Sequence, residues 1–158
     1  MKRSLIVLLA FLSLASVVAC KDIARMLPAS TIDNPTEGTP EFLIYKTIEA
    51  GLAPDAEEGW KMLRPYLHSS LTELRTSEDN FLNLNFAAFR RKVRFFTAGK
   101  PGTPEDQSPV YKLDYTEEDQ PDREHRVFVI TEASDMPSPF RIARDPKANN
   151  EWRVKNIP

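Results

Sequence analysis

The sequence has one cysteine, two histidines and five glycines among 158 residues, and each shortage excludes a class of site. A single cysteine cannot form the internal disulfides on which many small exported domains rely. Two separated histidines and no second cysteine leave no ligand cluster for a metal ion. No phosphate-binding glycine loop or nucleophile elbow is present either. The sequence therefore predicts neither a metal nor a cofactor.

Basic residues are slightly outnumbered, with 21 lysines and arginines against 23 aspartates and glutamates. Loss of residues 1–19 would also remove Lys2 and Arg3 and make the chain more acidic. Nucleic-acid binding calls for a strongly basic domain, so we expect no nucleic-acid partner. The remaining length suits one domain with a real core, and too little chain is left for two. The oligomeric state is left open.

The N-terminus has the layout of a secretory signal peptide. A short basic start, Met1–Ser4, precedes an apolar run from Leu5 to Leu14, and no charge occurs from there to Cys20. Secretory signals combine a positive n-region with an apolar h-region of about 7–15 residues, whereas a membrane-spanning helix needs roughly 20. Small residues precede Cys20, as a signal peptidase requires.

The four residues Val17-Val18-Ala19-Cys20 resemble the lipobox of bacterial lipoproteins. The resemblance implies cleavage after residue 19, diacylglycerol on the Cys20 thiol, and further acylation such as palmitate. Several acyl chains hold a protein stably on a membrane, whereas one holds it weakly. Lys21, in place of aspartate after the cysteine, favours the periplasmic face of the outer membrane over the inner membrane. The alternative is an ordinary secretory signal that ends near a cysteine.

The rest of the chain divides into a tether and one domain. Residues 20–38 contain prolines, asparagine and glycine with little apolar periodicity, and predict a flexible tether. The domain is expected over residues 39–158. Thr39-Pro40-Glu41 is a helix start, and Gly51 a helix end. A second helix is predicted from Asp55 to a stop or bend at Pro65.

A third helix is predicted from Ser77 to Gly99, where apolar residues recur at spacings of three and four. They are Leu82, Phe86, Phe89, Val93 and Phe96. After a proline-rich and glycine-rich loop, short β-type segments follow at 110–116, 126–131, 140–144 and 152–155. Helices followed by closely spaced strands predict an α+β fold with a four-stranded antiparallel meander.

This order of elements, with closing strands such as Phe140-Arg141-Ile142 and Trp152-Arg153-Val154, is similar to the nuclear-transport-factor-two-like fold of the cystatin-like class. The similarity would cover 39–158. It implies that a curved sheet wraps the long helix to form a cone. A pocket lined by Phe89, Tyr111 and Tyr115 is one expectation, and packing of the two tyrosines against the predicted third helix is the favoured alternative. The alternative is another α+β packing with helices on one face of the sheet.

Three functions remain open at this point. The favoured one is a non-catalytic domain of the cell envelope that binds or scaffolds a partner protein and is held to the membrane through Cys20. The second is a cone that binds a small ligand behind the predicted aromatic pocket. The third is a cone isomerase or dehydratase with His68 or Asp114 as base. Neither residue falls in a recognisable catalytic pattern. The basic run 90–94 suits either an anionic lipid or an acidic partner, or simply a solvated helix face.

Overall fold

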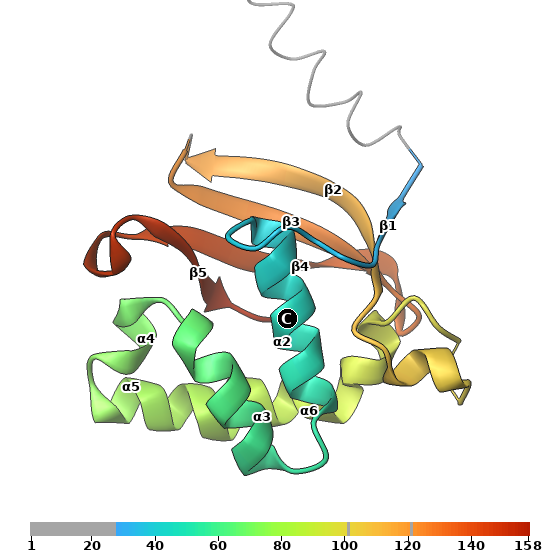
Figure 1. Ribbon diagram of the computed structural model, residues 1–158, viewed down its shortest axis with the longest axis horizontal. Coiled ribbons are helices and arrows are strands. Elements are labelled where there is room, and N and C mark those ends of the chain that lie inside the picture. Colours follow the sequence, from blue (N-terminus) through green and yellow to red (C-terminus); the bar gives the residue numbers. More distant parts are fainter. Residues whose placement is uncertain (1–27, 101, 121) are drawn as a thin grey trace, which may run out of the picture.

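The computed structural model describes residues 28–100, 102–120 and 122–158, and its fold is α+β. Figure 1 shows the helices gathered on one side of an antiparallel sheet whose strand order is β1-β2-β3-β4-β5. The sequence predicted four strands and the structure has five, while the sheet stays open between its edges β1 and β5. The predicted cone is therefore not confirmed. The strands are β1 (Ser30–Ile32), β2 (Tyr111–Gln120), β3 (Glu124–Thr131), β4 (Ser134–Asp145) and β5 (Glu151–Asn156).

The first two predicted helices are confirmed as α2 (Pro40–Leu52) and α3 (Ala56–Leu63). Each begins at a side-chain cap, because the Thr39 hydroxyl accepts from the Phe42 N–H at 3.3 Å and the Asp55 carboxylate accepts from the Glu58 N–H at 2.7 Å. After α3 the chain tightens into the 3₁₀ turn η1 (Arg64–Tyr66), which contains Pro65. The short helix α4 (Ser69–Thr72) follows and had no clear sequence signal.

The third predicted helix is a chain of four segments. They are α5 (Arg75–Asn80), the π-helical η2 (Phe81–Phe86), α6 (Ala87–Lys92) and the 3₁₀ segment η3 (Val93–Phe96). A π turn inserts extra residues and shifts the buried face. Phe81 is accordingly buried where the spacing predicted Leu82, which is only partly buried. From Phe86 to Phe96 the predicted stripe is buried.

Two strand predictions were wrong in instructive ways. The segment expected to be tether supplies β1, which pairs with the start of β2. Strand β4 begins at Ser134 and includes Pro137 and Pro139, whereas the predicted strand covered only 140–144. Strand β5 pairs only with the later part of β4, from Arg141 onward, so the first half of β4 is a sheet edge. An edge strand tolerates proline because no partner needs the missing N–H.

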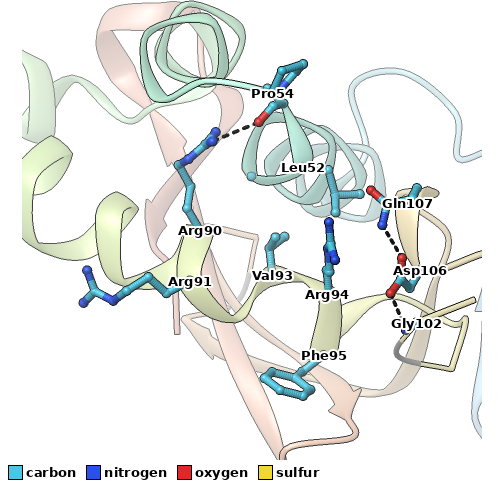
Figure 2. A pocket seen from close by; sticks show the side chains of 12 residues that line it. Leu52, Pro54, Arg90, Arg91, Val93, Arg94, Phe95, Gly102, Asp106 and Gln107 are labelled. Atoms are coloured by element: carbon cyan, nitrogen blue, oxygen red, sulfur yellow. Dashed lines mark hydrogen bonds between the residues drawn. The ribbon is translucent and has the colours of Figure 1, made fainter.

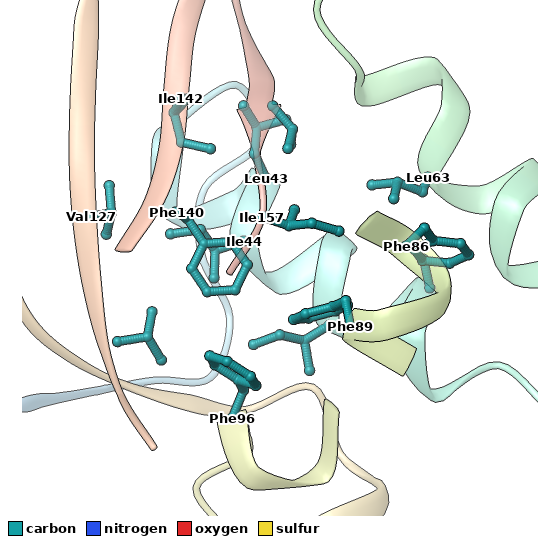
Figure 3. Packing of buried hydrophobic residues seen from close by; sticks show 14 of the residues in the cluster. Leu43, Ile44, Leu63, Phe86, Phe89, Phe96, Val127, Phe140, Ile142 and Ile157 are labelled. Carbon is teal, nitrogen blue, oxygen red and sulfur yellow. The ribbon is translucent and has the colours of Figure 1, made fainter. Parts of the chain in front are cut away.

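The core lies between the sheet and the helices (Figure 3). Phe89, Phe96 and Phe140 form an aromatic trio with ring centroids 5.3–5.9 Å apart, and Ile44, Val127 and Ile142 surround it. The core residues run from Leu43 to Ile157. The chain from Cys20 onward therefore contains every residue of the described core.

Two glycines let the helices approach closely. A Cβ on Gly59 in α3 would lie 2.3 Å from the carbonyl oxygen of Ala50, and one on Gly51 would lie 2.7 Å from a Val93 methyl group. Both distances are far below van der Waals contact. Glycine at these positions therefore sets the spacing of α2 against α3 and η3.

Candidate functional site

A pocket with charged walls lies at the end of α2, where α6 and η3 pass beside it (Figure 2). Its volume is about 640 Å³. One wall is the chain from Gly51 to Pro54, and the other carries Arg90, Arg91 and Arg94. The 3₁₀ turn η4 (Pro104–Gln107) closes the third side with Asp106 and Gln107. Three arginines against one aspartate make this pocket basic.

Arg90 belongs to the framework of the pocket. Its guanidinium donates to the carbonyl oxygens of Ala50 at 3.3 Å and Ala53 at 2.9 Å, at the C-terminus of α2. The last carbonyls of a helix lack intrahelical partners and carry partial negative charge, which a cation stabilises. The sequence grouped Arg90 with its neighbours as one basic run, and the structure separates it from them.

The other cations of this segment are unpaired. Arg91, Lys92, Arg94 and Lys100 form no ion pair with any residue in the described part of the chain. Figure 2 shows Arg94 pointing toward the pocket and Arg91 pointing away from it. Most other lysines and arginines have a carboxylate partner within 4 Å. They are Lys46, Lys61, Arg64, Arg75, Arg126, Arg141, Lys147, Arg153 and Lys155.

Asp106 is almost fully buried and holds the η4 wall in place. Its carboxylate accepts from the Gly102 N–H at 2.6 Å and from the Gln107 side-chain amide. A buried carboxylate is tolerated when hydrogen bonds satisfy it. The sequence predicted only a loop at η4. It gave no signal for either of the two pocket walls outside the arginine run, η4 and the segment 51–54, because neither carries a motif.

The three residues predicted to line a cone pocket do not come together. Phe89 and Tyr111 are fully shielded in the core, and the Tyr111 hydroxyl donates to the Glu41 carbonyl oxygen at 3.1 Å. Burial, followed by the nearby Glu41, raises the pKa of Tyr111 well above its ordinary value. Tyr115 stacks on Phe128, with ring centroids 4.3 Å apart.

A β-bulge separates the two tyrosines. Leu113 pairs with Val129, and after a register shift Tyr115 pairs with Phe128. Val129 is buried against the helices, and Phe128, its neighbour in the strand, points to the opposite face. Tyr115 therefore lies on the face away from Tyr111, and simple alternation put them on the same face.

The candidate bases serve local structure. His68 caps α4, where its Nδ1 lies 3.1 Å from the Ser70 N–H and 2.9 Å from the Ser70 hydroxyl. Asp114 sits at the bulge of β2. His125 is packed beside Trp152 with ring centroids 4.5 Å apart. Its buried Nε2 has no hydrogen-bond partner within the described residues.

Asp145 joins the sheet to α4 and is nearly fully buried. It accepts from the Ser69 N–H at 2.7 Å, the Ser69 hydroxyl at 2.9 Å and the Lys147 N–H at 2.9 Å. Burial by itself raises the pKa of this carboxyl group, but the hydrogen bonds outweigh burial and the pKa is lowered. With its oxygens occupied in this way, Asp145 does not orient His68 as a catalytic triad would require.

Cys20 and residues 1–27 lie outside the described residues, so the lipidation prediction is not addressed by the structure. Over residues 28–100, 102–120 and 122–158, no cluster of metal-ligating side chains occurs. In that same part of the chain no helix has both the length and the apolar character needed to cross a membrane. Comparisons with protein-family models, curated proteins and solved structures gave no match.

Proposed function

We propose that this chain is a lipoprotein of the bacterial cell envelope, lipidated on Cys20, whose domain binds a partner protein and does not catalyse a reaction. The proposed location is the periplasmic face of the outer membrane. The lipobox resemblance of residues 17–20 and the apolar run 5–14 support the anchor. Stable attachment follows from more than one acyl chain.

The observation that carries the binding role is the filled interior. Phe89 and Tyr111 are wholly shielded by packing, where a ligand-binding cone would need space, and Tyr115 stacks on the far face of the sheet. His68 caps α4, Asp145 accepts hydrogen bonds from the start of α4, and His125 packs against Trp152. On the surface, the cations of 91–100 have no ion pair among the described residues, and Leu74 and Leu84 are exposed. Such a distribution favours contact with another macromolecule.

The alternative is a small-ligand cone, and a cone isomerase or dehydratase is a further alternative with less support. The five-stranded open sheet gives neither of them a closed chamber among the described residues. A ligand in either case would have to displace packed aromatic side chains, which costs several kcal/mol for each large residue.

Native mass spectrometry of the protein, extracted gently from its own membranes, tests this proposal. We expect a second polypeptide of defined mass bound to the lipid-bearing chain, retained after mild chemical cross-linking in the intact cells. Cross-linking to the same polypeptide should fail in a Leu74→Glu, Leu84→Glu variant, whose two positions are exposed. A bound small molecule without a protein partner would overturn the binding role in favour of the ligand-binding alternative.

A further inference from the structure

One end of the molecule combines three features that lie far apart in the sequence. Figure 1 shows β1, the β3–β4 turn and the segment from η3 to η4 at the same end. The contacts agree: the Ala98 N–H donates to the Val110 carbonyl at 2.6 Å, beside the start of β2, and the Glu132 N–H donates to the Phe95 carbonyl at 3.1 Å. We call this part the basic end. We include in it the end of α6, so that its cations are Arg91, Lys92, Arg94, Lys100 and Lys112.

The basic end also exposes large apolar side chains. Phe95 follows Arg94 directly and is 37% exposed, and Met136 on the β3–β4 hairpin is 75% exposed. Ile130 lies within the same bulged part of the hairpin and is also exposed. Cations interleaved with exposed apolar residues are typical of surfaces that lie at the boundary between lipid headgroups and acyl chains. Glu132 and Asp135 at the hairpin turn, with Glu105 and the buried Asp106 in η4, offset part of the positive charge.

The chain toward the proposed anchor leaves from this end. Strand β1 pairs with the start of β2, with Ile32 opposite Tyr111 and Ser30 opposite Leu113. Ten peptide units separate Ser30 from Cys20, which span at most about 35 Å. A lipid on Cys20 would therefore keep the basic end within reach of the bilayer, whatever conformation those residues adopt.

We propose that the basic end binds the anionic phospholipid surface of the membrane that holds Cys20. This proposal deepens the proposed function and rests on it only for the location of the anchor. The phosphate-bearing headgroups supply the negative charge that these cations lack among the residues that the structure describes. Phe95, Met136 and Ile130 enter the headgroup region, and the helices α4 and α5 with exposed Leu74 point away from the lipid and face the partner.

Vesicle binding tests whether the basic end recognises negatively charged lipid. The chain starting at residue 20 with Cys20→Ser carries no lipid, so its binding reports the basic end alone, and circular dichroism verifies the fold. We expect it to sediment with vesicles of phosphatidylglycerol and phosphatidylcholine in equal parts, and to bind pure phosphatidylcholine at least tenfold more weakly. Binding should fall steeply when the Debye length is shortened from about 10 Å to about 3 Å with salt.

Two double variants with the same net charge locate the contact. Arg91→Gln with Arg94→Gln should weaken binding to the anionic vesicles on the order of tenfold. Lys61→Gln with Arg75→Gln removes the same charge from residues whose side chains are 71% and 94% exposed on α3 and α5, and should leave binding within about twofold. Equal losses in both variants, or equal binding to both kinds of vesicle, would overturn the proposal.

A fluorescent label tests the orientation. The Cys20→Ser chain has no other cysteine, so Met136→Cys and Leu74→Cys each give one labelling position of similar exposure. On anionic vesicles, an environment-sensitive dye should shift to the blue at position 136 and stay unchanged at position 74. The reverse pattern, or equal shifts, would contradict the proposed orientation. Failure of these tests leaves the Cys20 anchor and the partner open to separate measurement.

Discussion

The Arg90 guanidinium lies 2.9 Å from the carbonyl oxygen of Ala53, and this hydrogen bond joins the third helical region to the end of the first helix. The same side chain reaches the Ala50 carbonyl and lies over the Phe86 ring at 5.9 Å. A run of basic residues that looks uniform in the sequence therefore contains one framework residue, Arg90, beside cations that form no ion pair with any described residue.

Arg90 and Arg91 should respond differently to the same substitution. Arg90→Gln removes a charged donor from two carbonyls, and we expect it to lower the free energy of unfolding by about 1.5–3 kcal/mol. Arg91→Gln removes an exposed cation without a partner in the described chain, and should change it by less than about 0.5 kcal/mol. Urea denaturation of both variants measures the difference. Equal effects would show that the contacts of Arg90 contribute nothing.

Gly59→Ala should destabilise the protein although alanine favours helices. The substitution gains about 1 kcal/mol in helix propensity, but its Cβ would lie 2.3 Å from the Ala50 carbonyl oxygen. Overpacking of this kind costs about 1–3 kcal/mol or more. Thermal denaturation should therefore show a lower Tm for Gly59→Ala. Thr76→Ala at an exposed position of α5 is the matched control, and a higher Tm for both variants would contradict the close approach of α2 and α3.

Asp145→Asn should lower stability at neutral pH by about 1–3 kcal/mol, because three donors lose a charged acceptor. The pKa of Asp145 is lowered on folding, so its contribution is present above the unfolded-state pKa of about 3.9 and is lost as the pH falls through the lower folded-state pKa. The gap between wild type and Asp145→Asn should thus narrow below about pH 4. Asp135→Asn, an exposed control, should show no gap. A stability difference between wild type and Asp145→Asn that grows as the pH falls would contradict a lowered pKa of Asp145 in the folded state.

The two tyrosines of β2 should differ in the cost of truncation. Tyr111→Ala removes a fully buried ring and its hydrogen bond to Glu41, and should cost about 3–5 kcal/mol. Tyr115→Ala removes a stacked pair on the open face, and should cost about 0.5–1.5 kcal/mol. Chemical denaturation measures both. Similar large losses would place Tyr115 in the core with Tyr111 and restore the predicted shared face.

The helical part of the fold was predictable because its signals are local. Thr39 and Asp55 cap their helices within three residues, and the apolar spacing from Phe86 to Phe96 marks the buried face. The π turn at 81–86 was not predictable from spacing, because it depends on how Phe81 packs beneath Trp60, whose ring centroid lies 6.3 Å away.

The strands were harder to predict from the sequence because their bounds depend on which other strands they pair with. Proline is permitted in β4 only because β5 pairs with its second half, and β1 exists only because β2 offers a free edge. The bulge after Leu113 reverses the side on which Tyr115 lies, which removes one residue from the predicted pocket. The arginine run was visible in the sequence, but the loops that form the other pocket walls are placed by long-range contacts such as Arg90 with Ala53.

The most direct test of the account is the intact mass of the protein recovered from its own membranes, with Cys20→Ala as the control. The account predicts a chain that begins at Cys20 and carries the added mass of a diacylglycerol and further acyl groups, whereas the Cys20→Ala protein carries no lipid and keeps residues 1–19. A wild-type chain that has no lipid, or that retains residues 1–19, would contradict the anchored lipoprotein on which the account rests.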